Sequence, residues 1–179
     1  MKPDWDYRIM AIDPSTRSGL GIAIGDVING KLIPVYATTI DLMALAKWRY
    51  GYDDFEHRLL VLQEQVNRYL VDWTISLLAC EDCYLGISAK AYRMAIMAIT
   101  VLKSSAMDYT GHALQLMTPS VVKVYSQVPG NNGDKNRMAQ FVSGWVATLP
   151  ECRIDPATLD NHAIDALAIL HACHRRLIE

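Results

Sequence analysis

The stretch RIMAIDPSTRSGLGIAIGDVINGKLIPVYATTI, residues 8–40, decides the fold of this 179-residue chain. Three apolar segments within it, residues 8–13, 20–24 and 32–38, have the composition of strands. An Asn-Gly pair at residues 29–30 separates the last two segments and is a strong signal for a tight hairpin turn. The stretch therefore predicts three antiparallel strands at the start of the chain.

After residue 55 the apolar spacing changes to that of a helix, which we expect over residues 56–73. A short buried strand is predicted at 75–79, and a helix capped by Ser88 at 88–107. Because the helix at 88–107 is apolar on nearly every side, we expect it to be central. Residues 41–55 mix aromatic and charged side chains and yield no assignment.

The remaining pattern alternates loops with helices. We expect a strand at 113–117, then a short helix that begins at Thr118-Pro119. Two C-terminal helices follow, one with its apolar stripe at 138–149 and one at 160–177. The predicted order βββ-α-β-α-β-α-α-α is an α/β arrangement with one central sheet.

Composition limits the class of protein. The chain is 51% hydrophobic and 20% charged, which is typical of one globular domain that spans residues 1–179. No apolar run is long enough for a membrane span and no signal peptide is recognisable, so we expect a cytoplasmic protein. The net charge of −2 excludes a uniformly basic coat for nucleic acid but permits a local basic patch.

The four cysteines are expected to be thiols, as is usual in a chain that is not exported. Cys80 and Cys83 form a Cys-x-x-Cys pair, and a zinc site would need partners such as His171, Cys173 or His174. The spacing of those partners is not that of a zinc site, and Cys80 ends an apolar run that predicts burial. The sequence therefore favours buried thiols over zinc.

Two acids follow predicted strands. Asp13 ends the first strand, and Glu81 follows the apolar run 76–80 in the same way. Ligands of open α/β sheets bind beyond the carboxyl ends of the strands. If the two strands are neighbours, both carboxylates face one crevice, whereas either acid alone is better explained as the start of a loop.

The last helix carries a third acid. Asp165 lies in an apolar run, where an acid is rarely buried without a partner, and His162 shares its helical face. Three carboxylates and a histidine from distant segments suggest a site for Mg²⁺, or for Mn²⁺ in its place. Such sites favour attack by water on a phosphate, with two metal ions that clamp the attacking and leaving oxygens.

The segment 13–21 can also be interpreted as a phosphate-binding loop. Actin-like ATPases and sugar kinases likewise open with an acid, small and hydroxyl residues, and then a strand. Those proteins need a second, similar lobe and a chain about twice this long, more than one domain of this size supplies. The sequence contains no Walker motif either.

Basic and aromatic residues near the acids are consistent with DNA binding, since lysine and arginine supply most phosphate affinity and an aromatic can stack on an unpaired base. Ordinary surface charges, and an aromatic packed under a loop, are the alternative explanation. The candidate DNA-binding residues are Tyr84, Lys90, Arg93, Lys123, Lys135 and Arg137.

Three motifs resemble those of the RuvC Holliday-junction resolvases. Residues 11–19, AIDPSTRSG, look like that family's opening motif, and residues 80–84, CEDCY, like its second acidic motif. Residues 162–169, HAIDALAI, with Cys173-His174 after them, are similar to its C-terminal helix. The motifs occur in the family's order over nearly the whole chain, with residues 41–55 looking added.

The resemblance implies an RNase H-like fold, with a central mixed five-stranded sheet flanked by helices. It also implies a homodimer that cleaves four-way DNA junctions with divalent metal ions and leaves 5′-phosphate and 3′-hydroxyl ends. By position, the metal ligands would be Asp13, Glu81 and Asp165, with His162 as a fourth ligand or a proton carrier. The resemblance gives further roles to Lys123 and Lys135 as functional lysines, to Lys135 as the group that stabilises charge on the phosphate, and to Tyr84 as the aromatic near the junction centre.

The sequence departs from that family at two points. Ser15 stands where glycine is usual after Asp-Pro, and the chain is less basic than many members, which would suit a phage-encoded protein. Two rival functions stay open: another RNase H-like nuclease acting on branched DNA or RNA, and a junction-binding protein without catalysis. Intact acids count against the second rival, because a pure binder gains nothing from carboxylates that face phosphates.

Overall fold

The computed structural model describes residues 5–14, 19–51, 54–83, 88–128 and 135–179. Its centre is a mixed sheet of five strands in the order β3-β2-β1-β4-β5. The first three strands are antiparallel neighbours, whereas β4 runs parallel to β1, and β5 parallel to β4. The bounds are β1 Tyr7–Asp13, β2 Leu20–Ile28, β3 Lys31–Ile40, β4 Leu77–Glu81 and β5 Gln115–Met117.

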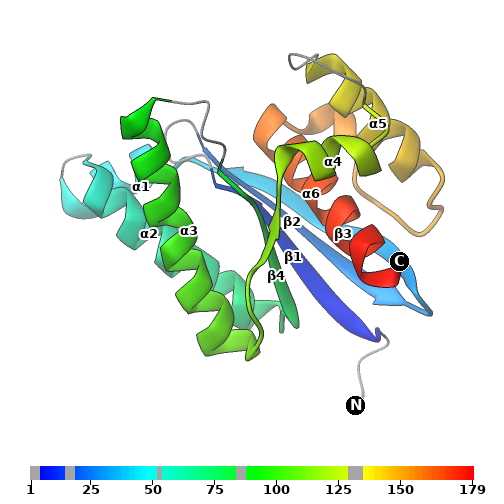
Figure 1. The fold of residues 1–179 in the computed structure, drawn as a ribbon, viewed down its shortest axis with the longest axis horizontal. Coiled ribbons are helices and arrows are strands. Elements are labelled where there is room, and N and C mark those ends of the chain that lie inside the picture. Colours follow the sequence, from blue (N-terminus) through cyan, green and yellow to red (C-terminus); the bar gives the residue numbers. More distant parts are fainter. Residues whose placement is uncertain (1–4, 15–18, 52–53, 84–87, 129–134) are drawn as a thin grey trace.

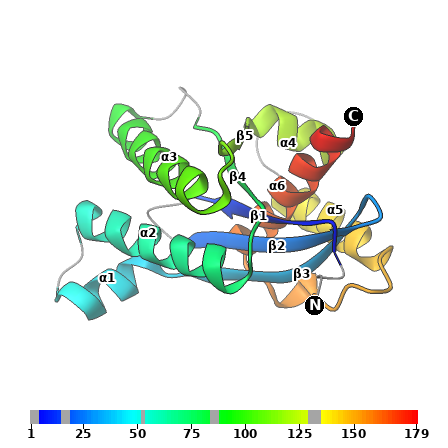
Figure 2. The same ribbon diagram turned by 90° about the horizontal axis from the view of Figure 1, so that it is seen from below.

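Helices cover both faces of this sheet (Figures 1 and 2). One layer holds α1 Leu42–Tyr50, α2 Phe55–Asp72 and α3 Ala89–Thr110, with α2 between the other two. The opposite layer holds α4 Pro119–Tyr125, α5 Lys135–Ala147 and α6 Asn161–Ile178. A 3₁₀ turn, Pro156–Thr158, precedes α6. None of the helices in the described part of the chain is long and apolar enough to cross a membrane.

The two faces of β1 build two separate cores. Met10 and Ile12 pack with the α1–α3 layer, whereas Ile9 and Ala11 pack with the α6 layer. This alternation follows from the period of two in a strand. It places the next odd residue, Asp13, on the face that α6 covers.

Local sequence signals fixed many of the boundaries. The Asn-Gly pair forms the β2–β3 turn with positive φ at both residues, as a two-residue hairpin requires. Side chains accept first-turn amides at the start of three helices: Ser88, the predicted cap, at α3, Thr118 at the predicted start of α4, and Asp160 at α6.

The structure adds one helix that the sequence did not reveal and corrects the expected position of another. Residues 42–50, within the unassigned stretch, form α1, whose weak amphipathic pattern gave no periodic signal. The helix α3 is not central: Ile96 and Met107 are exposed on its outer side, although Leu102 is fully buried. It is a surface helix that carries apolar residues on its exposed face, so apolar composition misled the expectation.

Candidate functional site

The two acids at strand ends lie side by side. β1 and β4 are parallel neighbours, with Ile12 opposite Cys80, so Asp13 and Glu81 continue the same row. Ala11 and Ala79, two residues before them, both belong to the core on the α6 side. The condition set by the sequence, that the two strands are neighbours, is therefore met, and both acids lie at the same edge of the sheet.

The first turn of α6 closes on this edge. Gly21 pairs with Asp13 across β1 and β2, and a methyl group at Gly21 would overlap the backbone carbonyl of His162. The absence of a side chain thus lets α6 approach the sheet. As a result, Nδ1 of His162 lies 2.7 Å from Oδ2 of Asp13 and donates a hydrogen bond to it.

The electrostatics of this edge are dominated by negative charge. Burial raises the pKa of Glu81 to about 7, and the charges of Asp13 and Asp165 act in the same direction. Lys123 on α4 opposes this shift. The structure therefore brings the third predicted acid, Asp165, and one predicted lysine into the electrostatic surroundings of the strand-end acids.

The same acids favour the charged form of His162. The hydrogen bond to Asp13 raises the pKa of His162 above its usual value, against the opposing effect of partial burial. The charges of Asp13, Asp160 and Asp165 add to this rise. An imidazolium beside three carboxylates offsets part of their repulsion.

The donor types at this edge fit a hard divalent cation. Carboxylate oxygens are the ligands that Mg²⁺ and Mn²⁺ prefer, and a cation would relieve the repulsion that Glu81 experiences. Within the described residues, however, no three histidine, cysteine, aspartate or glutamate side chains already stand close enough to form a metal cluster. One carboxylate oxygen of Asp13 instead accepts a hydrogen bond from His162.

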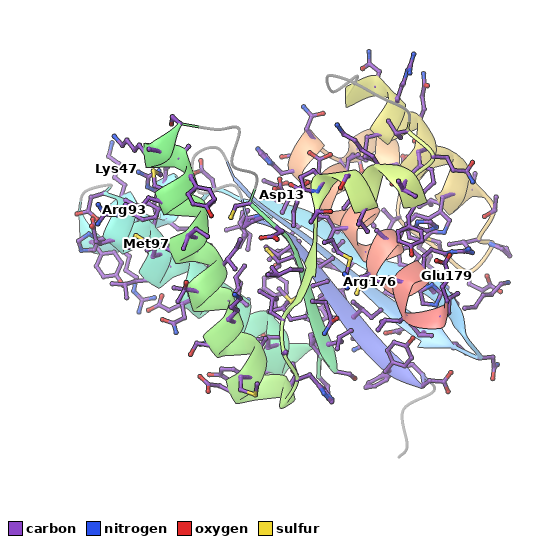
Figure 3. The ribbon with its side chains drawn as sticks, in the orientation of Figure 1. Asp13, Lys47, Arg93, Met97, Arg176 and Glu179 are labelled. Carbon is purple, nitrogen blue, oxygen red and sulfur yellow. The ribbon has the colours of Figure 1, made fainter. Side chains whose placement is uncertain are left out.

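The predicted DNA-binding residues that the structure describes lie on different helices near this edge. Lys90 and Arg93 are exposed in the first turns of α3, and Arg137 is exposed near the start of α5. Figure 3 shows Asp13 at the end of the sheet, with Arg93 on the α3 side. Tyr84 and the side chain of Lys135 lie outside the described residues, although Lys135 begins α5.

Sequence reasoning missed the residues that hold α6 in place. Gly21 is one of them, and the hydrogen bond from the Thr39 hydroxyl to Asp160 is another. Asp160 also caps α6, so it ties the first turn of that helix to the end of β3. The glycine spacing in Gly19-x-Gly21 was the available signal, because glycines inside a strand mark close approach of another backbone.

Comparisons with known proteins give a likeness in structure alone. No protein-family model and no curated protein matches the sequence. Among solved structures, Thermus thermophilus RuvC with a Holliday junction substrate is 17% identical, with a TM-score of 0.70 over 96% of each chain. The yeast mitochondrial Holliday junction resolvase is 11% identical, with a TM-score of 0.61 over 97% of this chain and 80% of that one.

A viral protein extends the same likeness. The fowlpox virus Holliday junction resolvase is 10% identical, with a TM-score of 0.56 over 94% of this chain and 99% of that one. At such identities the match establishes the fold. The expected RNase H-like fold, with a mixed five-stranded sheet flanked by helices, is thereby confirmed.

Proposed function

We propose that this chain is a RuvC-like resolvase, an endonuclease that cuts four-way DNA junctions by metal-dependent hydrolysis of phosphodiester bonds. One observation carries the proposal: Asp13 and Glu81 end neighbouring strands, and the charge of Asp165 on α6 also acts on Glu81, on the fold of three junction resolvases. Burying like charges together costs stability, so a fold that keeps them there needs a further reason.

Divalent metal ions supply that reason. Asp13, Glu81 and Asp165 would hold them, and we propose two Mg²⁺ ions per site, with Mn²⁺ as a substitute. When bound, such ions polarise the scissile phosphate and stabilise the charge that grows on it. Lys123, which already lowers the pKa of Glu81, favours the ionised carboxylate that metal binding needs.

The side chains around the acids have separate roles in the proposed reaction. His162 orients Asp13 through its hydrogen bond, and it either completes a metal shell or carries a proton near the attacking water. Lys135 would reach the scissile phosphate and offset its developing charge. Water attacks the phosphorus and the 3′ oxygen leaves, which gives 5′-phosphate and 3′-hydroxyl ends.

The DNA would lie across the carboxyl end of the sheet. Lys90 and Arg93 extend exposed from α3 on one side of the acids, and Arg137 from α5 on the other. Tyr84 would stack on a base near the junction centre. We further propose a single domain that acts as a cytoplasmic homodimer, since two symmetric cuts in one junction require two active sites.

The test is a comparison of substrates under defined metal conditions. The purified chain is incubated with a synthetic four-way junction, a flap and an RNA–DNA hybrid, each with Mg²⁺ or with a chelator, and product ends are mapped. We expect cleavage of the junction well above that of the other substrates, only with metal, with 5′-phosphate ends.

Each rival has its own outcome in this experiment. Preferred cleavage of the flap or the hybrid would indicate a different RNase H-like nuclease. Tight junction binding without cleavage at any Mg²⁺ or Mn²⁺ concentration would indicate a binding protein. Either result would overturn the proposal.

A further inference from the structure

The helix α1 presents an unusual surface residue. The side chain of Trp48 is 82% exposed, more than any other large apolar residue in the described part of the chain. Exposed tryptophan is costly in water and is concentrated where proteins bind partners. A contact surface around Trp48 would explain why α1 does not bury it.

The helix α1 is firmly attached to the fold, so Trp48 has a fixed platform. Leu42 and Ala46 on its inner side are buried in the core. Arg49 forms an ion pair of 2.6 Å with Glu64 on α2, and the ring of Tyr50 packs 4.5 Å from that of His57. These contacts leave the opposite side of α1, which carries Trp48, turned to solvent.

Cations flank the tryptophan. Lys47 and Arg49 are both exposed, and Lys47 takes part in no ion pair among the described residues. The nearby acid Asp41 is engaged in capping α1. An exposed aromatic ring beside an exposed lysine suits a polyanion, since the lysine attracts phosphates and the ring can pack on the sugars of the backbone.

The position of α1 connects this surface with the sheet edge. Asp13 pairs with Gly21, which in turn pairs with Thr39 on β3, and α1 begins three residues later. Trp48 lies six residues into α1, about 9 Å along its axis. Figure 2 shows α1 at the end of the sheet to which β1 points, and Figure 3 places Lys47 and Arg93 at that same end.

We propose that α1 is a DNA-contacting element, in which Trp48 and Lys47 bind one duplex arm of the junction outside the crossover. The inference rests on the proposed function and adds a surface to it. Two strand spacings of about 4.8 Å, three residues of extended chain and about 9 Å along α1 separate Asp13 from Trp48. Together they come to less than one turn of a duplex, about 34 Å, so an arm leaving the acids passes α1. DNA is favoured over a second copy of the chain, because a two-fold contact at Trp48 would bring Lys47 close to its own copy.

The experiment measures junction binding by Trp48→Ala in a chelator, at fixed salt, together with a hydroxyl-radical footprint. We expect the dissociation constant to rise about tenfold, on the scale of no longer burying one large apolar side chain. The footprint should lose protection on one arm and keep it at the crossover. Trp48→Phe should recover most of the affinity, and Lys47→Ala should lower the salt dependence of binding.

Val71→Ala is the matched control, because Val71 is 60% exposed on α2 near the end of that helix, away from α1. It should bind as the unmodified chain does. Unchanged binding and footprint in Trp48→Ala would overturn the inference. So would a change of oligomeric state without DNA, measured by sedimentation, because Trp48 would then lie between copies. If the unmodified chain binds no junction at all, the proposed function itself fails.

Discussion

The two ends of strand β1 differ in their balance of charge. At its start, the guanidinium of Arg8 meets both carboxylate oxygens of Asp26, at 2.5 and 3.0 Å, and donates to the backbone oxygen of Trp73 at 2.7 Å. The rings of Trp5 and Trp73 cover it, 4.9 and 5.5 Å from its central carbon. Arg8 and Asp26 at this end are therefore partners of each other.

At its other end the same strand gathers acids. Asp13 lies beside Glu81, and with Asp165 it raises the pKa of Glu81 above the level set by burial alone. His162 and Lys123 compensate only in part. Balanced charge at one end is explained by stability, whereas excess charge at the other calls for an added cation. Arg8 in the structural site and Asp13 in the proposed catalytic site are therefore only five positions apart on one strand.

The largest expected effect is on the rate of junction cleavage, when an acid at the end of β1 is replaced and compared with an acid at its start. Asp13→Asn or Asp165→Asn should lower the rate of junction cleavage at least about 10³-fold, because several kcal/mol of transition-state stabilisation depend on the metal ligands. Single-turnover cleavage beside a binding titration measures this. Asp26→Asn is the control. The fraction of this variant that folds should cleave the junction at the normal rate. Normal cleavage by Asp13→Asn would place the chemistry elsewhere.

The balanced end should matter for stability. Arg8→Met leaves Asp26 buried without its partner, so we expect a loss of about 3–5 kcal/mol in the free energy of unfolding. Urea unfolding followed by tryptophan fluorescence measures it. The double variant Arg8→Met with Asp26→Leu should recover much of the loss, because no unpaired charge remains. A loss below about 1 kcal/mol in the single variant would show that this end is not a structural anchor.

The excess acids should make stability depend on pH when metal is absent. The pKa of Glu81 is about 7 in the folded state and near 4.5 in the unfolded chain, so the folded state binds more protons between those values. Stability from this group is therefore full below pH 4.5 and is lost as pH rises through 7, by about 3 kcal/mol in all. The raised pKa of His162 acts in the same direction.

The readout is the difference in unfolding free energy between the unmodified chain and Glu81→Gln in a chelator. We expect the free energy of unfolding of the variant to rise relative to that of the unmodified chain from pH 5 to pH 8. A difference that does not change with pH would mean that burial and the neighbouring acids do not raise the pKa of Glu81.

A smaller effect is expected from the close approach of α6. Gly21→Ala places a methyl group against the backbone of His162, so the first turn of α6 must move away from β2. Overpacking of this kind costs about 1–3 kcal/mol. Cleavage should fall as well, since His162 loses its position beside Asp13. Gly144→Ala, where a methyl group meets nothing within 4 Å, is the matched control and should keep both stability and cleavage.

Local signals in the sequence predicted the strands, the caps and the acids. Asp13 and Glu81 were visible because each ends an apolar run, and their proximity followed once β1 and β4 proved to be parallel neighbours. The three motifs also led to the fold that the solved structures confirm. These features depend on a few adjacent residues, so a single sequence displays them.

Features that depend on packing between distant segments were not predictable. The helix α1 shows no clear periodicity, because only Leu42 and Ala46 of its residues are fully buried. The surface position of α3 was misjudged, because its apolar residues continue onto an exposed side. The hydrogen bond between His162 and Asp13 joins residues 149 positions apart, and only the close approach at Gly21 permits it.

The central claim is that the acids at the end of β1 serve catalysis at the expense of stability. One paired measurement on Glu81→Gln tests it: the free energy of unfolding at pH 8 without metal, and junction cleavage with Mg²⁺, on the same preparation. We expect a protein that is more stable than the unmodified chain by about 1–3 kcal/mol and is inactive. A variant that is less stable, or one that cleaves the junction normally, would contradict the claim.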